Sequence, residues 1–129
     1  MEIVTENPVA LAWIGDAVYT LAVRRHLFEK GMRKADLLQK TSAKFNGAAG
    51  QAAVLDLLME RNLLNEDEQE IVRRGRNAHV KSPSKSTDLK TYLKATGLEA
   101  LFGYLDLYHH PERRDELMKI CMDLQEELL

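Results

Sequence analysis

The 129 residues predict an all-α protein, a compact helical bundle. Sustained alternation of polar and apolar residues, which marks strands, is absent, whereas apolar residues recur at helical spacing in several segments. Only three prolines interrupt the chain, and its seven glycines are scattered. No internal repeat, low-complexity segment or inter-domain linker is visible, so residues 1–129 are expected to form a single domain.

The first helix is expected to begin at Asn7 and Pro8. Asparagine is a favoured N-cap, and proline fits the first turn because its missing N–H would be unpaired there. The apolar pattern then continues to about Lys30, where Gly31 is expected to end the helix. A second, shorter helix is predicted over residues 34–41.

The third helix is predicted over residues 46–61, and a fourth begins near Asn65. In the third, four apolar residues share one face: Ala48, Ala52, Leu55 and Leu58. In the fourth, Asn65 can cap the first turn, and the three acids that follow it favour a helix N-terminus. This helix is expected to fray near Arg76.

The third quarter of the chain contains one clear loop, residues 78–86, which is polar, basic and contains proline. Thr87 is then expected to cap a helix that reaches about His109, with a disturbance at Gly97. Pro111 is typical of a first helical turn, so a last helix is predicted from there nearly to the end of the sequence.

Composition narrows the class of protein. Apolar residues make up 45% and charged residues 29%, which is ordinary for a globular protein. No apolar run approaches the roughly 20 residues of a membrane span, and residues 1–6 lack the basic start of a signal peptide. Cys121 is the lone cysteine, so it cannot form an intramolecular disulfide and is expected in the core. These features predict a cytoplasmic location.

The net charge of −2 conceals a segregation of charge along the chain. Residues 24–44 contain seven Lys and Arg against two acids, and residues 71–95 contain seven against Asp88 alone. The segments 45–70 and 96–129 are acidic. Such blocks are typical either of a basic face that meets a polyanion or of ordinary solvated helix faces, and charge alone does not separate the two.

Two carboxylates lie in runs that are otherwise apolar: Asp16 within residues 10–19, and Glu99 within residues 98–105. A charge on a buried stretch costs several kcal/mol unless it is paired or binds a metal. Two such helices in one small domain can bring the acids together, and Mg²⁺ needs only one or two carboxylates when water and phosphate complete its shell. The alternative is that Asp16 is satisfied by an arginine or a backbone N–H and that Glu99 is solvated.

Other candidates are weaker. His109 and His110 are adjacent, so they point to different helix faces, and no third ligand lies at metal-binding spacing. The serines of the basic loop lack the surroundings of an activated nucleophile. Residues 74–77, Arg-Gly-Arg-Asn, have no phosphate-loop spacing, but with the loop they are typical of a surface that contacts phosphates.

The residues around the two acids resemble a known family. Ala12-Trp13-Ile14-Gly15-Asp16-Ala17-Val18 is similar to the signature helix of the ribonuclease III family. Leu98-Glu99-Ala100-Leu101-Phe102-Gly103-Tyr104-Leu105 is similar to its second motif. The resemblance extends to the Mini-ribonuclease III branch through Asn7-Pro8, residues 14–19, residues 73–78, Thr87-Asp88 and Thr91-Tyr92, in order over nearly the whole chain.

This resemblance implies a bundle of the ribonuclease III endonuclease-domain type and a metal-dependent endoribonuclease. It implies that Asp16 and Glu99 hold Mg²⁺, with Mn²⁺ able to substitute, and that two copies form a homodimer through their signature helices. Its implied substrate is double-stranded RNA, at the ends of the 23S ribosomal RNA precursor, with a ribosomal protein presenting it. The residues expected to contact RNA are basic or polar: Arg73, Arg74, Arg76, Asn77, His79, Lys81 and Lys85.

The sequence also departs from the family pattern, and these departures bear on metal binding and on RNA affinity. Ordinary members carry further acids where this chain has Val9, Ala12 and Thr96, so only Asp16 and Glu99 remain of the acidic cluster. The nuclease helices are also expected to occupy these residues without a double-stranded RNA-binding domain, so affinity is expected from the catalytic domain itself. Two alternatives stay open on the sequence: a non-catalytic module that binds RNA or a ribosomal partner, and a structural helical dimer without RNA affinity.

Overall fold

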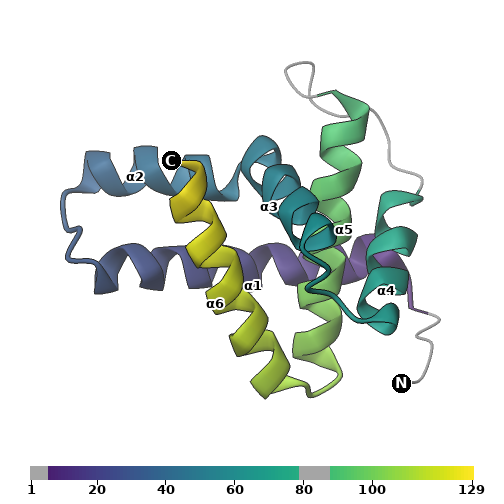
Figure 1. The fold of residues 1–129 in the computed structure, drawn as a ribbon. Helices are drawn as coiled ribbons and strands as arrows, with labels where there is room; N and C mark the ends of the chain where they lie inside the picture. The colour runs from purple at the N-terminus through teal and green to yellow at the C-terminus, as the bar shows by residue number, and fades with distance from the viewer. Residues whose placement is uncertain (1–5, 79–87) are drawn as a thin grey trace.

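A computed structural model describes residues 6–78 and 88–129, and these residues form six helices and no strand. The helices are α1 (Pro8–Glu29), α2 (Ala35–Asn46), α3 (Ala48–Glu60), α4 (Glu66–Arg76), α5 (Leu89–Leu107) and α6 (Pro111–Leu128). The all-α prediction is confirmed. The predicted loop, apart from Ala78, lies outside the described residues. Figure 1 shows α2 beside α1, and α5 crossing α1.

Helix α1 begins and ends as its sequence predicts. The Asn7 side chain accepts a hydrogen bond from the backbone N–H of Val9 at 2.8 Å, so it satisfies a donor that has no partner inside the helix. Gly31 follows the last turn with φ +96°, in the left-handed region that favours glycine. A long, uninterrupted α1 therefore carries Asp16 near its middle.

Helix α2 is longer than predicted, and the boundary with α3 shifts as a result. The predicted end at residue 41 is wrong because α2 continues to Asn46, and α3 therefore starts at Ala48 rather than at residue 46. Phe45, in the last turn of α2, is completely buried, and its ring centroid lies 5.9 Å from that of His26 on α1. Burial of this ring stabilises the extra turn, which local propensity alone does not reveal.

Helix α4 begins with the predicted cap, in its full reciprocal form. The Asn65 side chain accepts from the N–H of Glu68, and the Glu68 carboxylate accepts from the N–H of Asn65. Glu68 is 2% exposed and also forms a two-pronged ion pair with Arg113 of α6, at 2.7 Å for both bonds. Burial alone would raise the pKa of Glu68, but Arg113 and the Asn65 N–H lower it below its usual value. This network fastens α4 to α6.

Helix α5 differs from its prediction at both ends and in the middle. Asp88, not Thr87, caps it, by accepting from the Thr91 N–H at 2.9 Å. The helix stops at Leu107 rather than His109, because His109 has a positive φ of 59°. The disturbance predicted at Gly97 is absent, and α5 passes through that residue without a break.

The core lies around α5, which contacts α1, α3, α4 and α6. Four large apolar residues of this helix are buried: Leu98, Leu101, Phe102 and Leu105. Cys121 of α6 is buried and free, as predicted. No helix in the described part of the chain is long and apolar enough to cross a membrane.

Candidate active site

The backbones of α1 and α5 touch where the helices cross. A Cβ atom placed on Gly15 would lie 1.6 Å from the carbonyl oxygen of Glu99, and one placed on Gly103 would lie 1.9 Å from that of Leu11. Glycine is therefore required at both positions, because any side chain would overlap the opposite backbone. The segment that approaches Gly15 so closely is α5 of the same chain.

This crossing brings the two predicted acids together. Asp16 follows Gly15 on α1, and its side chain is within hydrogen-bonding reach of Glu99 on α5. Asp16 is exposed, whereas Glu99 is half-buried. The pair therefore lies at the surface end of the crossing, where an ion or a phosphate group can reach it.

Burial and the closeness of Asp16 hinder ionisation of Glu99 when no cation is present. Burial raises the pKa of Glu99 to about 8, and the hydrogen bond and negative charge of Asp16 contribute to the rise. Near neutral pH, Glu99 is thus mainly protonated and can donate a hydrogen bond to the Asp16 carboxylate. A bound divalent cation would displace that proton and offset the negative charges of the two carboxylates.

Gln51 of α3 is a third member of this site and was not predicted from the sequence. Its side chain is 1% exposed, and its amide lowers the pKa of Glu99. Like the two acids, Gln51 is a polar residue in an otherwise apolar helical run, and that signal was present in residues 48–55.

The residues at the crossing fit one hard cation with a largely open shell. Among the described residues, no group of three or more His, Cys, Asp or Glu side chains is placed to hold a metal. His109 and His110 are therefore not part of such a group. Thr96, at a position where ordinary family members carry an acid, donates its hydroxyl to the Tyr92 carbonyl at 3.0 Å. Two carboxylates suit Mg²⁺ when water and phosphate oxygens supply the remaining ligands.

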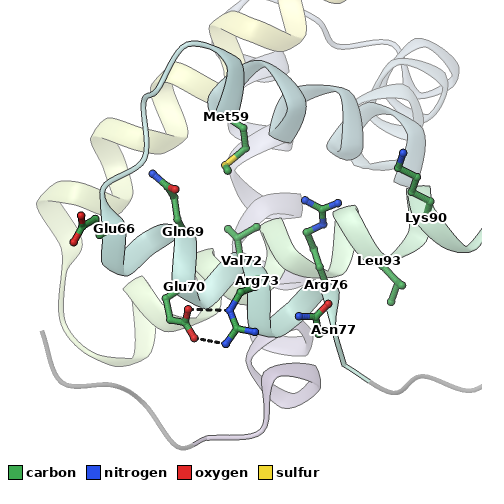
Figure 2. Close-up of a pocket in the computed structure, with 10 residues that line it drawn as sticks. All are labelled: Met59, Glu66, Gln69, Glu70, Val72, Arg73, Arg76, Asn77, Lys90 and Leu93. Carbon is green, nitrogen blue, oxygen red and sulfur yellow. Dashed lines mark hydrogen bonds and ion pairs between the residues drawn. The ribbon is translucent and has the colours of Figure 1, made fainter.

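A groove of about 600 Å³ lies between α3, α4 and α5. Figure 2 shows that it extends from Glu66 at one end to Lys90 at the other. Apolar, amide, basic and acidic side chains line it: Met59, Glu66, Gln69, Glu70, Val72, Arg73, Arg76, Asn77, Lys90 and Leu93. Of these ten residues, only Arg73, Arg76 and Asn77 were predicted as site residues.

The structure places some of the predicted RNA-contacting residues in this groove. Arg76 and Asn77 line it, and Arg73 also lines it but is paired with Glu70, with Nε 2.9 Å from the carboxylate (Figure 2). Arg74 is half-buried and does not line the groove. The other three predicted residues fall outside the described part of the chain: His79, Lys81 and Lys85.

Comparison with known proteins identifies the family. The family described as "Ribonuclease III domain" matches residues 9–109. Mini-ribonuclease 3 of Streptococcus pneumoniae is 41% identical over 116 residues, which is 90% of this chain and 91% of that protein. Mini-ribonuclease 3 of Symbiobacterium thermophilum is 41% identical over 122 residues, covering 95% and 92%. A crystal structure of a Fusobacterium nucleatum protein superposes with a TM-score of 0.81 at 26% identity, covering 97% of this chain and 96% of that one.

The chain therefore belongs to the ribonuclease III family and, within it, to the Mini-ribonuclease III group. It is an endoribonuclease, of a family that acts on double-stranded RNA. The six-helix fold is of the ribonuclease III type, as the sequence resemblance implied.

Proposed function

We propose that Asp16 and Glu99 form a divalent-cation site at which this chain, as a single catalytic domain over residues 1–129, hydrolyses double-stranded RNA. The observation that carries the proposal is the meeting of the two acids at the glycine-lined crossing of α1 and α5. Mg²⁺ is the proposed ion, with Mn²⁺ able to substitute. When bound, it would lower the pKa of a water molecule and stabilise charge on the scissile phosphate.

The two acids have different roles in this proposal. Asp16 is exposed and presents its carboxylate toward solvent and substrate. Glu99 is half-buried and holds a proton until the cation arrives, because its pKa is about 8. By analogy with the family, water attack would leave a 5′-phosphate and a 3′-hydroxyl.

Cleavage of long double-stranded RNA in Mg²⁺, with a chelator as control, tests this function. We expect cleavage with Mg²⁺ and none with the chelator. Equal cleavage in both would contradict the metal site, and binding without cleavage under any condition would contradict catalysis by this chain.

The groove between α3, α4 and α5 is the proposed RNA surface. Double-stranded RNA is recognised mainly through its backbone and 2′-hydroxyl groups, which favours basic and amide side chains such as Arg76, Asn77 and Lys90. Lys90 and Glu99 lie on the same helix, nine residues apart, or about 14 Å along its axis. Nine residues are also about two and a half helical turns, so Lys90 and Glu99 project from opposite sides of α5, and RNA bound in the groove would have to cross this helix to reach the acid pair.

Binding of RNA should weaken steeply as salt rises, despite the net charge of −2. Each phosphate contact releases counterions, so replacing Arg76 or Lys90 with alanine should reduce the slope of log K against log salt by about one. Lys119 is exposed on α6 and does not line the groove, so Lys119→Ala is the matched control and should leave the slope unchanged. Filter binding at several salt concentrations measures the slopes. A binding constant independent of salt would contradict this surface.

A homodimer through α1 is the proposed assembly. The face of α1 that no other described helix covers carries apolar side chains at helical spacing. Trp13 is 76% exposed and Leu21 is 51% exposed, and both lie on the same side as Ala17. Packing against a second α1 would bury them. Gly15, although it lies in the signature helix, is covered by α5 of its own chain. Sedimentation equilibrium distinguishes a dimer from the 14.7 kDa monomer.

The proposed substrate is the base-paired stem at the ends of the 23S ribosomal RNA precursor, presented by a ribosomal protein. Support comes from the resemblance to the Mini-ribonuclease III group, together with a groove that suits a duplex backbone. The cytoplasm is the proposed compartment, since ribosomal precursors are processed there in bacteria.

A further inference from the structure

Gln51 differs from the other buried polar residues of the described chain in having an unpaired donor. The others are Glu68, Thr96 and Gln125. Glu68 is paired with Arg113, and the Thr96 hydroxyl donates to a backbone carbonyl. Gln125 donates to the Tyr19 hydroxyl at 2.7 Å and to the Phe45 carbonyl at 2.9 Å. The Nε2 atom of Gln51, by contrast, has no hydrogen-bond partner among the described residues.

An unpaired amide in a protein interior costs stability. Nε2 has lost its hydration without gaining a partner, which leaves a desolvation penalty that an apolar side chain of similar size would avoid. Core packing therefore does not explain a glutamine at this position, whereas it does explain the neighbouring apolar residues Ala52 and Leu55. Such an orphan group calls for a ligand or a second state of its surroundings.

The surroundings of Gln51 identify that second state. The Gln51 amide on α3 lies within reach of the Glu99 carboxyl group on α5, although Nε2 does not make an ordinary hydrogen bond to it. An N–H donor favours the ionised form of a carboxyl group. Glu99 thus lies between two polar side chains. The Asp16 carboxylate on α1 is a hydrogen-bond acceptor, and the Gln51 amide on α3 is a donor without a partner among the described residues.

We propose that Gln51 is a positioning residue of the cation site: when Glu99 is fully ionised on a bound divalent cation, the Gln51 amide donates to that carboxylate and holds it in ligand geometry. Gln51 does not touch the cation or the RNA. This inference rests on the proposed function, because it requires that Glu99 bind the cation. Outer partners of metal ligands orient them, and their loss typically lowers metal affinity or activity 10- to 100-fold.

Gln51→Met tests the proposal, because methionine is similar in size and unbranched but lacks the donor. Gln125→Met is the matched control, since Gln125 is a similarly buried glutamine whose Nε2 atom donates two hydrogen bonds elsewhere. Calorimetric titration of each protein with Mg²⁺, in the absence of RNA, gives the Mg²⁺ affinity. Thermal melting gives the stability. Cleavage of double-stranded RNA is the third readout.

Opposite outcomes are expected for the two variants. Q51M should melt at or above the wild-type temperature, bind Mg²⁺ about 10- to 100-fold more weakly and cleave correspondingly more slowly. Q125M should melt at a lower temperature and, where folded, bind Mg²⁺ as the wild type does. Wild-type Mg²⁺ affinity in Q51M would overturn the role of Gln51 and leave the proposed function intact. Absence of Mg²⁺ binding in the wild type would overturn both.

The unaltered protein provides a second measurement that does not depend on a folded variant. The side-chain amide resonances of Gln51, assigned through their contacts with Glu99, should shift on Mg²⁺ saturation as Nε2 gains its hydrogen bond. Those of Gln125 should not move. Unchanged Gln51 resonances at saturating Mg²⁺ would overturn the proposal.

Discussion

Asp16→Asn should abolish cleavage of double-stranded RNA and leave the fold intact. Asparagine keeps the size of the side chain but removes its charge, so one of the two proposed carboxylate ligands is lost. Removing a group that stabilises developing charge typically lowers the rate by about 100-fold or more. Because Asp16 is exposed, and an asparagine oxygen can still accept the hydrogen bond of protonated Glu99, the variant should be about as stable as the wild type. Gel assays of cleavage and circular dichroism measure the two effects.

Asp123→Asn is the matched control. Asp123 is also exposed on a helix, but it lies on α6, away from the crossing, so the same change there should leave cleavage unaffected. Wild-type cleavage by the Asp16→Asn variant would remove Asp16 from the site. Loss of cleavage together with loss of helicity would assign it a structural role instead.

Gly15→Ala should have the largest effect on stability of any single methyl addition in α1. Alanine is the better helix former, yet its Cβ would lie 1.6 Å from the Glu99 carbonyl oxygen, and both atoms are fixed by helical backbones. The helices would have to separate, which would disrupt the core around α5 and displace Glu99 from Asp16. We expect a loss of more than about 4 kcal/mol in the free energy of unfolding, measured in urea.

Gly31→Ala provides the comparison for this change. Gly31 has a positive φ but nothing within 4 Å of its added Cβ, so only backbone strain of about 1 kcal/mol is expected. If Gly15→Ala cost no more than Gly31→Ala, the close contact between α1 and α5 would be contradicted.

Local signals in the sequence were sufficient to predict most of the fold. Asn7 and Asn65 cap helices through their own side chains, so the starts of α1 and α4 could be identified without knowledge of tertiary structure. The end of α2 could not, because it depends on burial of Phe45 against other helices. The Glu68–Arg113 pair was likewise unpredictable, since its partners lie 45 residues apart in sequence.

In the candidate site too, local signals could be predicted from the sequence, and contacts between distant segments could not. Asp16 and Glu99 were noticeable because a charge in an apolar run is costly, and the structure places them together. Gln51 gave a similar but weaker signal, because an uncharged amide is less costly to bury, and it was missed. The groove could not be predicted in full, since Met59, Lys90 and Leu93 come from two helices that only the fold brings beside α4.

Proton release on cation binding tests most directly whether Asp16 and Glu99 hold a divalent ion. Because the pKa of Glu99 is about 8 in the metal-free protein, the group is mainly protonated at pH 7 and must lose its proton to become a ligand. Calorimetric titration with Mg²⁺ in two buffers of different ionisation enthalpy should therefore show release of about one proton per bound cation at pH 7. Release should fall toward zero well above pH 8, where Glu99 is already ionised. Binding without proton release at pH 7, or equal binding by Glu99→Gln, would contradict the site.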